Sequence, residues 1–466
     1  MWQTIKKDIH SIMSEMFMNG TITDDQKKGI LVCIQKRSDP RNMQDYRTLT
    51  LLNADYKLLT RLIANRIQPW ITNALYQNQY CGIKSRTMLD AVATIRDAIA
   101  YAQYTKSPLC IVTLDFEAAF DNISHEYLFA VLKGYGFSNE MRQRIRQLYE
   151  NTTAAVKING ILSQQIPIKC AIRQGCPLSM QIYALCLDPL LKELQTIMTG
   201  SRKGKTQANN TVMAYADDVT LLVSDPQVIP KIQETIRRYE AASGARINYA
   251  KSQAMAINNW NTETEIMDIT YVSQIKILGI YFTPSINQTI HKNWEIATRR
   301  TRVMAKEAYH RELDMDKRIA YVHTYILATV WYIAQMLPIP SNCVRRINMA
   351  ITLYIWRGAI FRVPLATIQS PKKKGRWGLI NVEAKCKMMY IRRMQDIAFN
   401  RRETKAEWPR RWDLAQQEVN PPNITRIPTQ LQYIRIYAMD SAYIPEKNQR
   451  KLTDHIKTEF IIQCAS

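Results

Sequence analysis

The sequence contains little glycine and proline and has no closely paired cysteines. Only 14 of its 466 residues are glycine and 18 are proline, which excludes a collagen-like or low-complexity chain. The nine cysteines are odd in number and none forms a C-x-x-C pair, which argues against a disulfide framework and against a zinc ribbon. Apolar residues make up 46% of the chain, enough for a sizeable core in roughly two to four structural units.

Long apolar runs are also scarce. The stretch that is long enough to suggest a membrane span, residues 319–337, contains His323 and Gln335 as well as three tyrosines and two threonines. We therefore expect a buried helix there and no membrane partner. The N-terminal MWQTIKKDIHSIM lacks the basic-then-apolar pattern of a signal peptide, and the unpaired cysteines favour a reducing intracellular setting.

Acidic residues are too few to balance the basic ones. Lys and Arg total 63 against 40 Asp and Glu, a formal net charge of +23. Residues 351–410 alone hold fourteen basic and four acidic side chains, so part of the excess is concentrated. Such a surplus indicates a polyanionic partner, most often nucleic acid, and the alternative is an ordinary soluble basic protein.

The middle of the chain is predicted to contain strands mixed with helices. Residues 110–116 form an apolar run that ends near an acid, and Asn159-Gly160 lies between β-formers, a strong hairpin signal. Two further strand-like runs, 211–214 and 219–224, flank an acidic turn. Helices are expected after Ser124, after Ser138 and from 227 to 243. The pattern predicts an α+β or mixed α/β architecture.

Two acidic clusters lie at the ends of these strands, Asp115 and the pair Asp217-Asp218. Adjacent strands would bring the carboxylates together, and burying them is costly unless a cation compensates. Mg²⁺ takes oxygen ligands, and two ions about 3.5–4 Å apart can activate a 3′-hydroxyl and stabilise a leaving pyrophosphate. The acids with their basic surroundings therefore suggest nucleotidyl transfer. The alternative is an ordinary Asp-rich turn.

Several motifs resemble those of reverse transcriptases from non-LTR (LINE-type) retrotransposons, in the family's order. The central three are LDFEAAFD at 114–121, RQGCPLS at 173–179 and YADD at 215–218. Ahead of them stand DYRTLTLLN at 45–53 and QYCGIKSR at 79–86; after them come SGARIN at 243–248, Lys251-Ser252 and ILGI at 277–280. This ordered set is far more specific than any single motif.

The resemblance implies a metal site. Asp115 and Asp217 would ligate two Mg²⁺ ions, with Mn²⁺ as an alternative metal. The backbone carbonyl of Phe116 would add an oxygen, and Asp218 would lie beside them as a further catalytic acid.

The resemblance also implies substrate contacts. Lys36 and Arg47 would hold the triphosphate, Gln174 and Gly175 would line the incoming nucleotide, and Phe120 would exclude a ribose 2′-hydroxyl. The other implied positions are Ala216 at the primer terminus, Lys251 near the pyrophosphate and Gly279 in the primer grip. The alternative for Phe120 is a core aromatic, and the alternative for Lys251 is a solvated lysine.

The sequence departs from the family in the fingers motifs. Thr48-Leu49 replace the usual Pro-Ile after Arg47, and Lys84-Ser85 stand where a Pro-Gly pair is usual. The metal-site residues are unaffected, so we expect retained catalysis. The alternatives are an inactive RNA-binding relic, or an RNA-dependent RNA polymerase, although those enzymes usually carry G-D-D in place of YADD.

The implied fold is a right-hand polymerase of the α+β class. We expect helical fingers over residues 1–106, a palm with an antiparallel sheet over 107–284, a helical thumb over 285–345 and a basic helical extension over 346–466. The expected activity is RNA-directed DNA synthesis from dNTPs on template RNA and primer or target DNA.

Two further expectations concern the chain as a whole. Autonomous members of the family carry an endonuclease that this sequence does not show, so we expect a truncated copy. The basic residues 371–376 suggest nuclear import, with a charged loop as the alternative. In the basic segment, Trp356, Trp377 and Tyr390 are expected either to stack on nucleic acid or to pack in the core.

Overall fold

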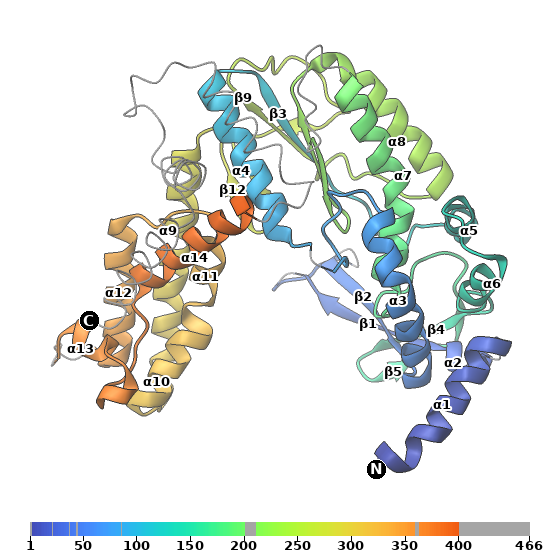
Figure 1. Ribbon diagram of the computed structural model, residues 1–466, viewed down its shortest axis with the longest axis horizontal. Helices are drawn as coiled ribbons and strands as arrows, with labels where there is room; N and C mark the ends of the chain where they lie inside the picture. The colour runs from blue at the N-terminus through green and yellow to red at the C-terminus, as the bar shows by residue number, and fades with distance from the viewer. Residues whose placement is uncertain are drawn as a thin grey trace, which may run out of the picture. The chain divides into compact units, whose positions relative to one another are not determined.

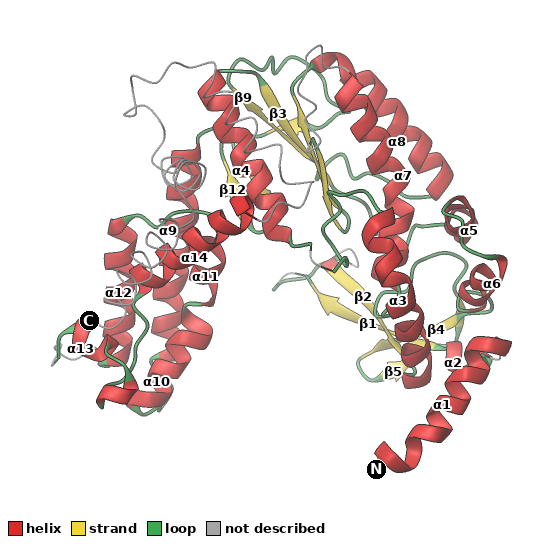
Figure 2. Ribbon diagram, viewed as in Figure 1, coloured by secondary structure: helices red, strands yellow, loops and turns green. Residues whose placement is uncertain are grey.

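The structure is a computed structural model that describes residues 2–399, apart from 21, 37, 43–44, 85, 201–210 and 359–362. The chain forms two compact units. The first contains Met1–Ala98 and Tyr104–Val272, and the second contains Ile99–Gln103 and Ser273–Ser466. Both helices and strands are present (Figure 2), so the predicted mixed α/β composition is confirmed.

A five-stranded sheet forms the centre of the first unit, in the order β10-β9-β3-β8-β7. Every pairing is antiparallel except that of β10 with β9. The strands are β3 (Leu109–Leu114), β7 (Val212–Tyr215), β8 (Asp218–Val223), β9 (Gln253–Ile257) and β10 (Thr270–Tyr271). Strand β3 lies in the middle and is apolar throughout except Thr113, as the sequence predicted.

The outer edge of β7 is covered by residues 78–80. Ala214 donates its N–H to the Asn78 carbonyl at 3.0 Å, and the Tyr80 N–H donates to the Ala214 carbonyl at 2.9 Å. Gln79 and Ala214 thus form a parallel bridge. This contact satisfies backbone groups that an open sheet edge would leave unpaired, and it supports the strand that leads into the acidic turn.

Helices of the first unit pack on this sheet and beside it. Helices α7 (Ser179–Gly200) and α8 (Ile229–Ser243) lie side by side (Figure 1). The three predicted helices are confirmed: Ser124 caps α5 (His125–Gly134), Ser138 caps α6 (Asn139–Gln147), and α8 ends at Ser243, before Gly244 with φ 79°. The remaining helices are α1 (Trp2–Asn19), α2 (Asp24–Lys27), α3 (Ala54–Ala74) and α4 (Met88–Thr105).

A second sheet corrects the expectation that residues 1–106 are helical. Its path is β2-β1-β4-β5, and β6 also pairs with β4. The strands are β1 (Gly29–Gln35), β2 (Tyr46–Leu52), β4 (Thr153–Ile158), β5 (Ile161–Leu162) and β6 (Ile166–Pro167). Strands β1 and β4 are parallel, with Gly29 opposite Ala154. A local sequence pattern does not reveal a partner strand so far along the chain.

The predicted hairpin at Asn159-Gly160 is confirmed, and both residues have positive φ.

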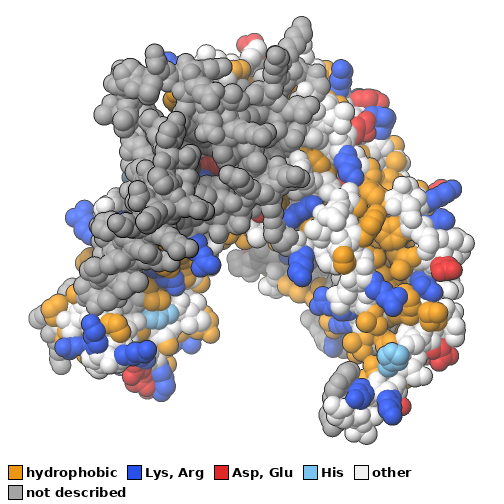
Figure 3. Space-filling model, in the orientation of Figure 1, with side chains coloured by type: hydrophobic (Ala, Val, Ile, Leu, Met, Phe, Trp, Pro, Cys, Tyr) orange, Lys and Arg blue, Asp and Glu red, His pale blue; other side chains and the backbone are white. Residues whose placement is uncertain are grey.

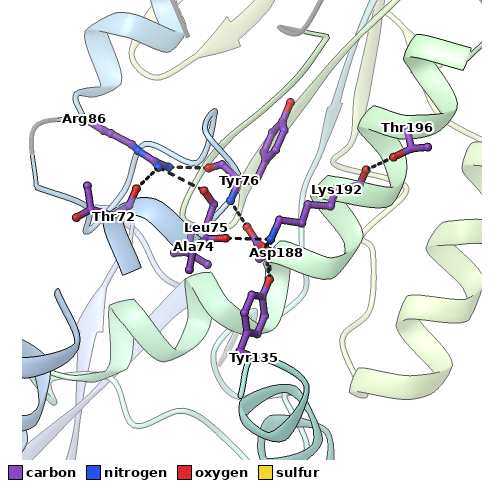
Figure 4. A network of polar contacts seen from close by, with 9 residues as sticks. All are labelled: Thr72, Ala74, Leu75, Tyr76, Arg86, Tyr135, Asp188, Lys192 and Thr196. Carbon is purple, nitrogen blue, oxygen red and sulfur yellow. Dashed lines mark hydrogen bonds and ion pairs between the residues drawn. The ribbon is translucent and has the colours of Figure 1, made fainter. Parts of the chain in front are cut away.

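A buried carboxylate, Asp188 of α7, joins the helices of the first unit. It accepts hydrogen bonds from the Tyr76 N–H and the Tyr135 hydroxyl, and it pairs with Lys192 at 2.8 Å (Figure 4). Arg86 closes the end of α3 by donating to backbone carbonyls of Thr72, Leu75, Tyr76 and Gln79. The network holds residues 72–79, which lead into the strand-like residues 78–80.

The part of the second unit that the structure describes is mainly helical, as predicted. A short hairpin, β11 (Ile275–Ile277) and β12 (Ile280–Phe282), precedes the helices. These are α9 (Ile286–Ala308), α10 (Met315–Tyr321), the π-helical turn η3 (Val322–Ile326), α11 (Ala328–Ala334), α12 (Ser341–Ile355), α13 (Leu365–Gln369), the 3₁₀ turn η4 (Lys372–Lys374) and α14 (Val382–Phe399).

The stretch 319–337 is largely buried, but it is not one continuous helix. The π-helical turn η3 interrupts it, and His323 accepts a hydrogen bond from the Ile380 N–H at 3.0 Å. No described helix combines the length and the apolar character that a bilayer crossing needs.

In the basic segment that follows, Tyr390 is buried and Trp356 and Trp377 are half-buried, so packing accounts for much of these rings. The basic residues Arg362, Arg401, Arg402, Lys405 and Arg410 lie outside the described residues.

A candidate catalytic carboxylate site

The two predicted acidic clusters meet at one end of the central sheet. Leu114, the last residue of β3, pairs with Val219 of β8, so the next position on each strand holds Asp115 and Asp218. Tyr215 pairs with Asp218, which leaves Ala216 and Asp217 as a two-residue hairpin turn. Ala216 is buried and has φ 56°, a conformation that is uncommon for a residue with a Cβ. Strand pairing therefore places all three aspartates together.

The backbone of Asp115 is fixed on the side of β3 where β9 lies. Its N–H donates to the Ser252 hydroxyl at 3.0 Å, and its carbonyl accepts from the Asn248 N–H at 2.7 Å. Phe116 forms an antiparallel bridge with Ile247. The hydrogen bonds of this bridge are made by the residues on either side, from the Glu117 N–H to the Arg246 carbonyl and from the Asn248 N–H to the Asp115 carbonyl. In such a pair the N–H and C=O of the central residue point away from the partner segment. The Phe116 carbonyl is thus directed away from residues 246–248.

Burial and neighbouring acidic charges raise the pKa of two of the acids. At Asp218, burial first, and then the charges of Asp217 and Asp115, raise the pKa to about 6, although much of the side chain reaches solvent. At Asp115, burial again raises the pKa; Asp217 adds to the effect, and the cations of Lys251 and Lys36 oppose it. Such shifts are those expected of carboxylates held near like charges without a cation between them.

The oxygen atoms at this site suit a hard divalent cation whose coordination shell is completed by the substrate. Among the residues that the structure describes, no group of three or more His, Cys, Asp or Glu side chains is close enough to hold a metal ion by itself. Mg²⁺ is commonly held by only one or two carboxylates, together with water and substrate phosphates. Asp115, Asp217 and the Phe116 carbonyl would supply oxygen ligands of that kind, so these residues fit the metal that the resemblance implies.

Gln174 and Gly175 lie against strand β2. The Gln174 carbonyl accepts the Thr50 N–H at 2.9 Å. Gly175 has φ 103°, and a Cβ at this position would lie 2.5 Å from the Thr50 carbonyl oxygen. Only glycine allows so close an approach of two backbones. The preceding residue, Arg173, is buried and donates to the Lys27 carbonyl at 2.6 Å, which anchors the segment.

Phe120 lies in the turn that follows Asp115, stacked on a buried tyrosine. Its ring centroid is 4.4 Å from that of Tyr183, with 22° between the planes. The Phe120 carbonyl accepts the Ile172 N–H at 2.7 Å. The side chain is only partly buried. The stacking on Tyr183 holds the Phe120 ring in place, as in a core contact. The exposed part of the same ring remains available to a ligand.

The predicted cations are distributed over two strands and a turn. Lys36 directly follows β1, and its charge acts on both Asp115 and Asp121. Lys251 lies in the turn that precedes β9 and acts on Asp115. Arg47 lies exposed on β2, paired with Ile34 in β1. The structure therefore brings Lys36 and Lys251 to the acids and places Arg47 on the neighbouring strand.

Gly279 belongs to the second unit. It lies in the turn between β11 and β12 with φ 84°, after Leu278, whose φ is 47°. The Tyr332 hydroxyl donates to the Leu278 carbonyl and holds this turn. The geometry explains the glycine as a turn residue.

One polar residue at the site had no role assigned from the sequence. The Asp121 carboxylate accepts the Gln174 side-chain amide, with both oxygens 3.4 Å from Nε2. Asp121 could have been singled out in the sequence, because it is the last residue of the motif that begins at Leu114. Its contact with Gln174 could not, because the two residues are fifty-three positions apart. Ser252 and Asn248 were also part of a recognised motif, and their contact with the backbone of Asp115 required the fold.

Paired carboxylates at a strand end, flanked by lysines and a glycine-containing loop, define a site suited to phosphoryl transfer. The sequence matches the family model described as reverse transcriptase (RNA-dependent DNA polymerase) over residues 34–282. The matched region covers more than half of the chain and contains the whole carboxylate site. The chain belongs to the reverse transcriptase family.

Relatives among curated proteins come from non-LTR retrotransposons, which confirms the resemblance seen in the motifs. The transposon TX1 149 kDa protein of Xenopus laevis is 27% identical, over 84% of this chain and 30% of that protein. The Pol polyprotein of the R2DM element of Drosophila melanogaster is 21% identical, over 88% of this chain and 38% of the polyprotein. The RNA-directed DNA polymerase of the mobile element jockey of Drosophila funebris is 22% identical, over 67% and 35%. The chain thus spans about a third of each relative's length.

Among solved structures, telomerase from Candida albicans superposes on 77% of this chain and 67% of its own, with a TM-score of 0.45 and 10% identity. Telomerase from Candida tropicalis gives a TM-score of 0.41 over 87% of this chain and 74% of its own, with 12% identity.

Proposed function

We propose that this chain is the RNA-directed DNA polymerase of a non-LTR retrotransposon, which transfers nucleotides from dNTPs to a primer 3′-hydroxyl. The observation that carries the proposal is the meeting of Asp115 with Asp217 and Asp218 at paired strand ends, inside the region that matches the reverse transcriptase family. The raised pKa values of Asp115 and Asp218, caused by burial and by neighbouring acidic charges, support a site built to receive cations.

In this proposal Asp115 and Asp217 hold two Mg²⁺ ions, Phe116 adds its carbonyl oxygen, and Asp218 stands beside them. The ions, when bound, supply the charge that activates the 3′-hydroxyl and stabilises the departing pyrophosphate. The lysines that already act on Asp115, Lys36 and Lys251, provide fixed positive charge for the triphosphate, as does Arg47 on β2.

The nucleotide would lie against the segment that contains Gln174 and Gly175. Close packing of Gly175 on Thr50 keeps this surface free of side-chain bulk. The partly exposed Phe120 would meet the sugar and exclude a 2′-hydroxyl, and Ala216 would meet the primer terminus. Gly279 would belong to the primer grip.

We further propose the subdomains of a right-hand polymerase: fingers over 1–106, palm over 107–284, thumb over 285–345 and a basic extension over 346–466. Lys and Arg side chains are spread over the face seen in Figure 3, which supports template RNA and primer DNA as partners.

Nuclear entry belongs to the same proposal. Lys372–Lys374 form an exposed 3₁₀ turn. A fluorescent fusion should accumulate in nuclei, and replacing the three lysines by alanine should abolish the accumulation. Unchanged accumulation in the variant would refute this signal.

The proposal is tested by primer extension on a primed RNA template, with dNTPs and rNTPs supplied separately. A reverse transcriptase incorporates dNTPs on RNA. An RNA polymerase would prefer rNTPs, and an inactive relic would bind the template without extending the primer.

A further inference from the structure

Asp121 occupies the junction of three segments of the first unit. It closes the turn after β3, where its N–H donates to the Ala118 carbonyl at 2.7 Å. The segment 171–174 runs beside this turn, since the Ile172 N–H binds the Phe120 carbonyl and the Ala171 N–H binds the Ile123 carbonyl. The backbone at Asp121 is therefore held on both sides.

The Asp121 side chain faces the side chain of Gln174. Both carboxylate oxygens lie 3.4 Å from Gln174 Nε2, a long contact for a hydrogen bond. Contacts in free active sites are often long and shorten when the substrate binds. The backbone of Gln174 is held separately, because its carbonyl accepts the Thr50 N–H at 2.9 Å.

An ionised carboxylate only accepts hydrogen bonds, so it determines which way the amide is turned. Gln174 must present its NH₂ group to Asp121, and its Oε1 atom then points elsewhere as an acceptor. Burial raises the pKa of Asp121, and the Gln174 amide, the Thr48 hydroxyl and the Lys36 charge all oppose this rise. A half-buried carboxylate is costly to keep ionised, and these partners reduce that cost.

We infer that Asp121 is a positioning residue that fixes the orientation of the Gln174 amide, and thereby the position in which the incoming nucleotide binds. Asp121 interacts with Gln174, with Thr48 of β2 and with the charge of Lys36, which directly follows β1. It therefore links the nucleotide-lining loop with the two strands near the triphosphate cations. It acts through Gln174 and not on the reacting atoms. The inference rests on the proposed function.

The test is steady-state primer extension by the full chain carrying Asp121→Asn, a change that keeps the shape and removes the obligatory acceptor. An asparagine can donate to Gln174, so the amide is no longer held in one orientation. We expect the KM for dNTP to rise about tenfold, the size of one charge-assisted hydrogen bond, with kcat changed much less. The control is Glu126→Gln, an equal charge change at an exposed position on α5.

A double-mutant cycle with Gln174→Ala separates positioning from a structural role. If Asp121 acts through Gln174, Asp121→Asn should add little once Gln174 is replaced. Full additivity of the two changes, or a lower melting temperature with an unchanged KM, would overturn the inference. Asp121→Glu, which keeps the acceptor, should restore part of the affinity. Inactivity of the unmodified chain would instead refute the proposed function.

Discussion

Asp115 directly follows strand β3, and Asp218 begins the strand that pairs with it, so the two carboxylates stand at adjacent strand ends although 102 residues separate them in sequence. Asp217 precedes Asp218 in the hairpin turn. Like charges held this close are unfavourable on their own. In the proposed function, cations and a phosphate-bearing substrate would offset this cost, and the first and last predictions below follow from the arrangement.

The pH dependence of stability should report the burial of Asp218 and the neighbouring acidic charges. The folded-state pKa of Asp218, about 6, lies above the ordinary value of 3.8. Between these values the folded chain retains a proton that the unfolded chain has lost, so stability falls as pH rises through the window. Urea denaturation in EDTA should show Asp218→Asn gaining stability over the unmodified chain from pH 4 to pH 7. Glu126→Gln, on exposed α5, should show no such trend. A constant difference between Asp218→Asn and the unmodified chain would contradict the assigned environment.

Phe120 should control sugar selectivity. Replacing it by alanine removes the ring that would meet the 2′-hydroxyl, so Phe120→Ala should lower the dNTP/rNTP discrimination by about tenfold or more. Single-nucleotide incorporation measures this ratio. The variant also loses the stacking on Tyr183, so its melting temperature must be recorded as a control. An unchanged ratio in a folded variant would assign Phe120 to the core alone.

Gly175 should not tolerate a side chain. An alanine Cβ would lie 2.5 Å from the Thr50 carbonyl oxygen at a φ of 103°. Gly175→Ala should cost about 2 kcal/mol of stability and reduce extension. The matched control is Gly136→Ala, which has φ 76° but no atom within 4 Å of the added Cβ. Its cost should be smaller, about 1 kcal/mol. Equal costs would show that the contact with Thr50 is unimportant.

The buried Asp188 network should matter more than a surface ion pair. Asp188→Asn weakens the bonds to the Tyr76 N–H and the Tyr135 hydroxyl and leaves Lys192 without its counter-charge. We expect a loss of about 3 kcal/mol in urea denaturation. The exposed pair of Asp316 with Lys372 provides the control, since Asp316→Asn should cost at most about 1 kcal/mol. Comparable losses would refute the structural role of Asp188.

Local patterns predicted the features that depend on near neighbours. The apolar run of β3, the hairpins at Asn159-Gly160 and at Asp217, and the caps at Ser124 and Ser138 are all visible in short stretches of sequence. The three aspartates were recognised because motif order supplied the long-range information. The sheet formed by β1 with β4 and the contact of Asp121 with Gln174 were not predicted, because each joins segments whose patterns carry no sign of their partner.

The most direct test of the carboxylate site is Mg²⁺-dependent incorporation of labelled dNTPs on a primed RNA template, comparing the unmodified chain with Asp217→Asn. We expect the unmodified chain to extend the primer only when the metal is present. The variant should lose roughly a thousandfold in rate, or about 4 kcal/mol in the barrier, with its melting behaviour preserved. Undiminished extension by a folded Asp217→Asn chain would contradict the assignment of the metal site.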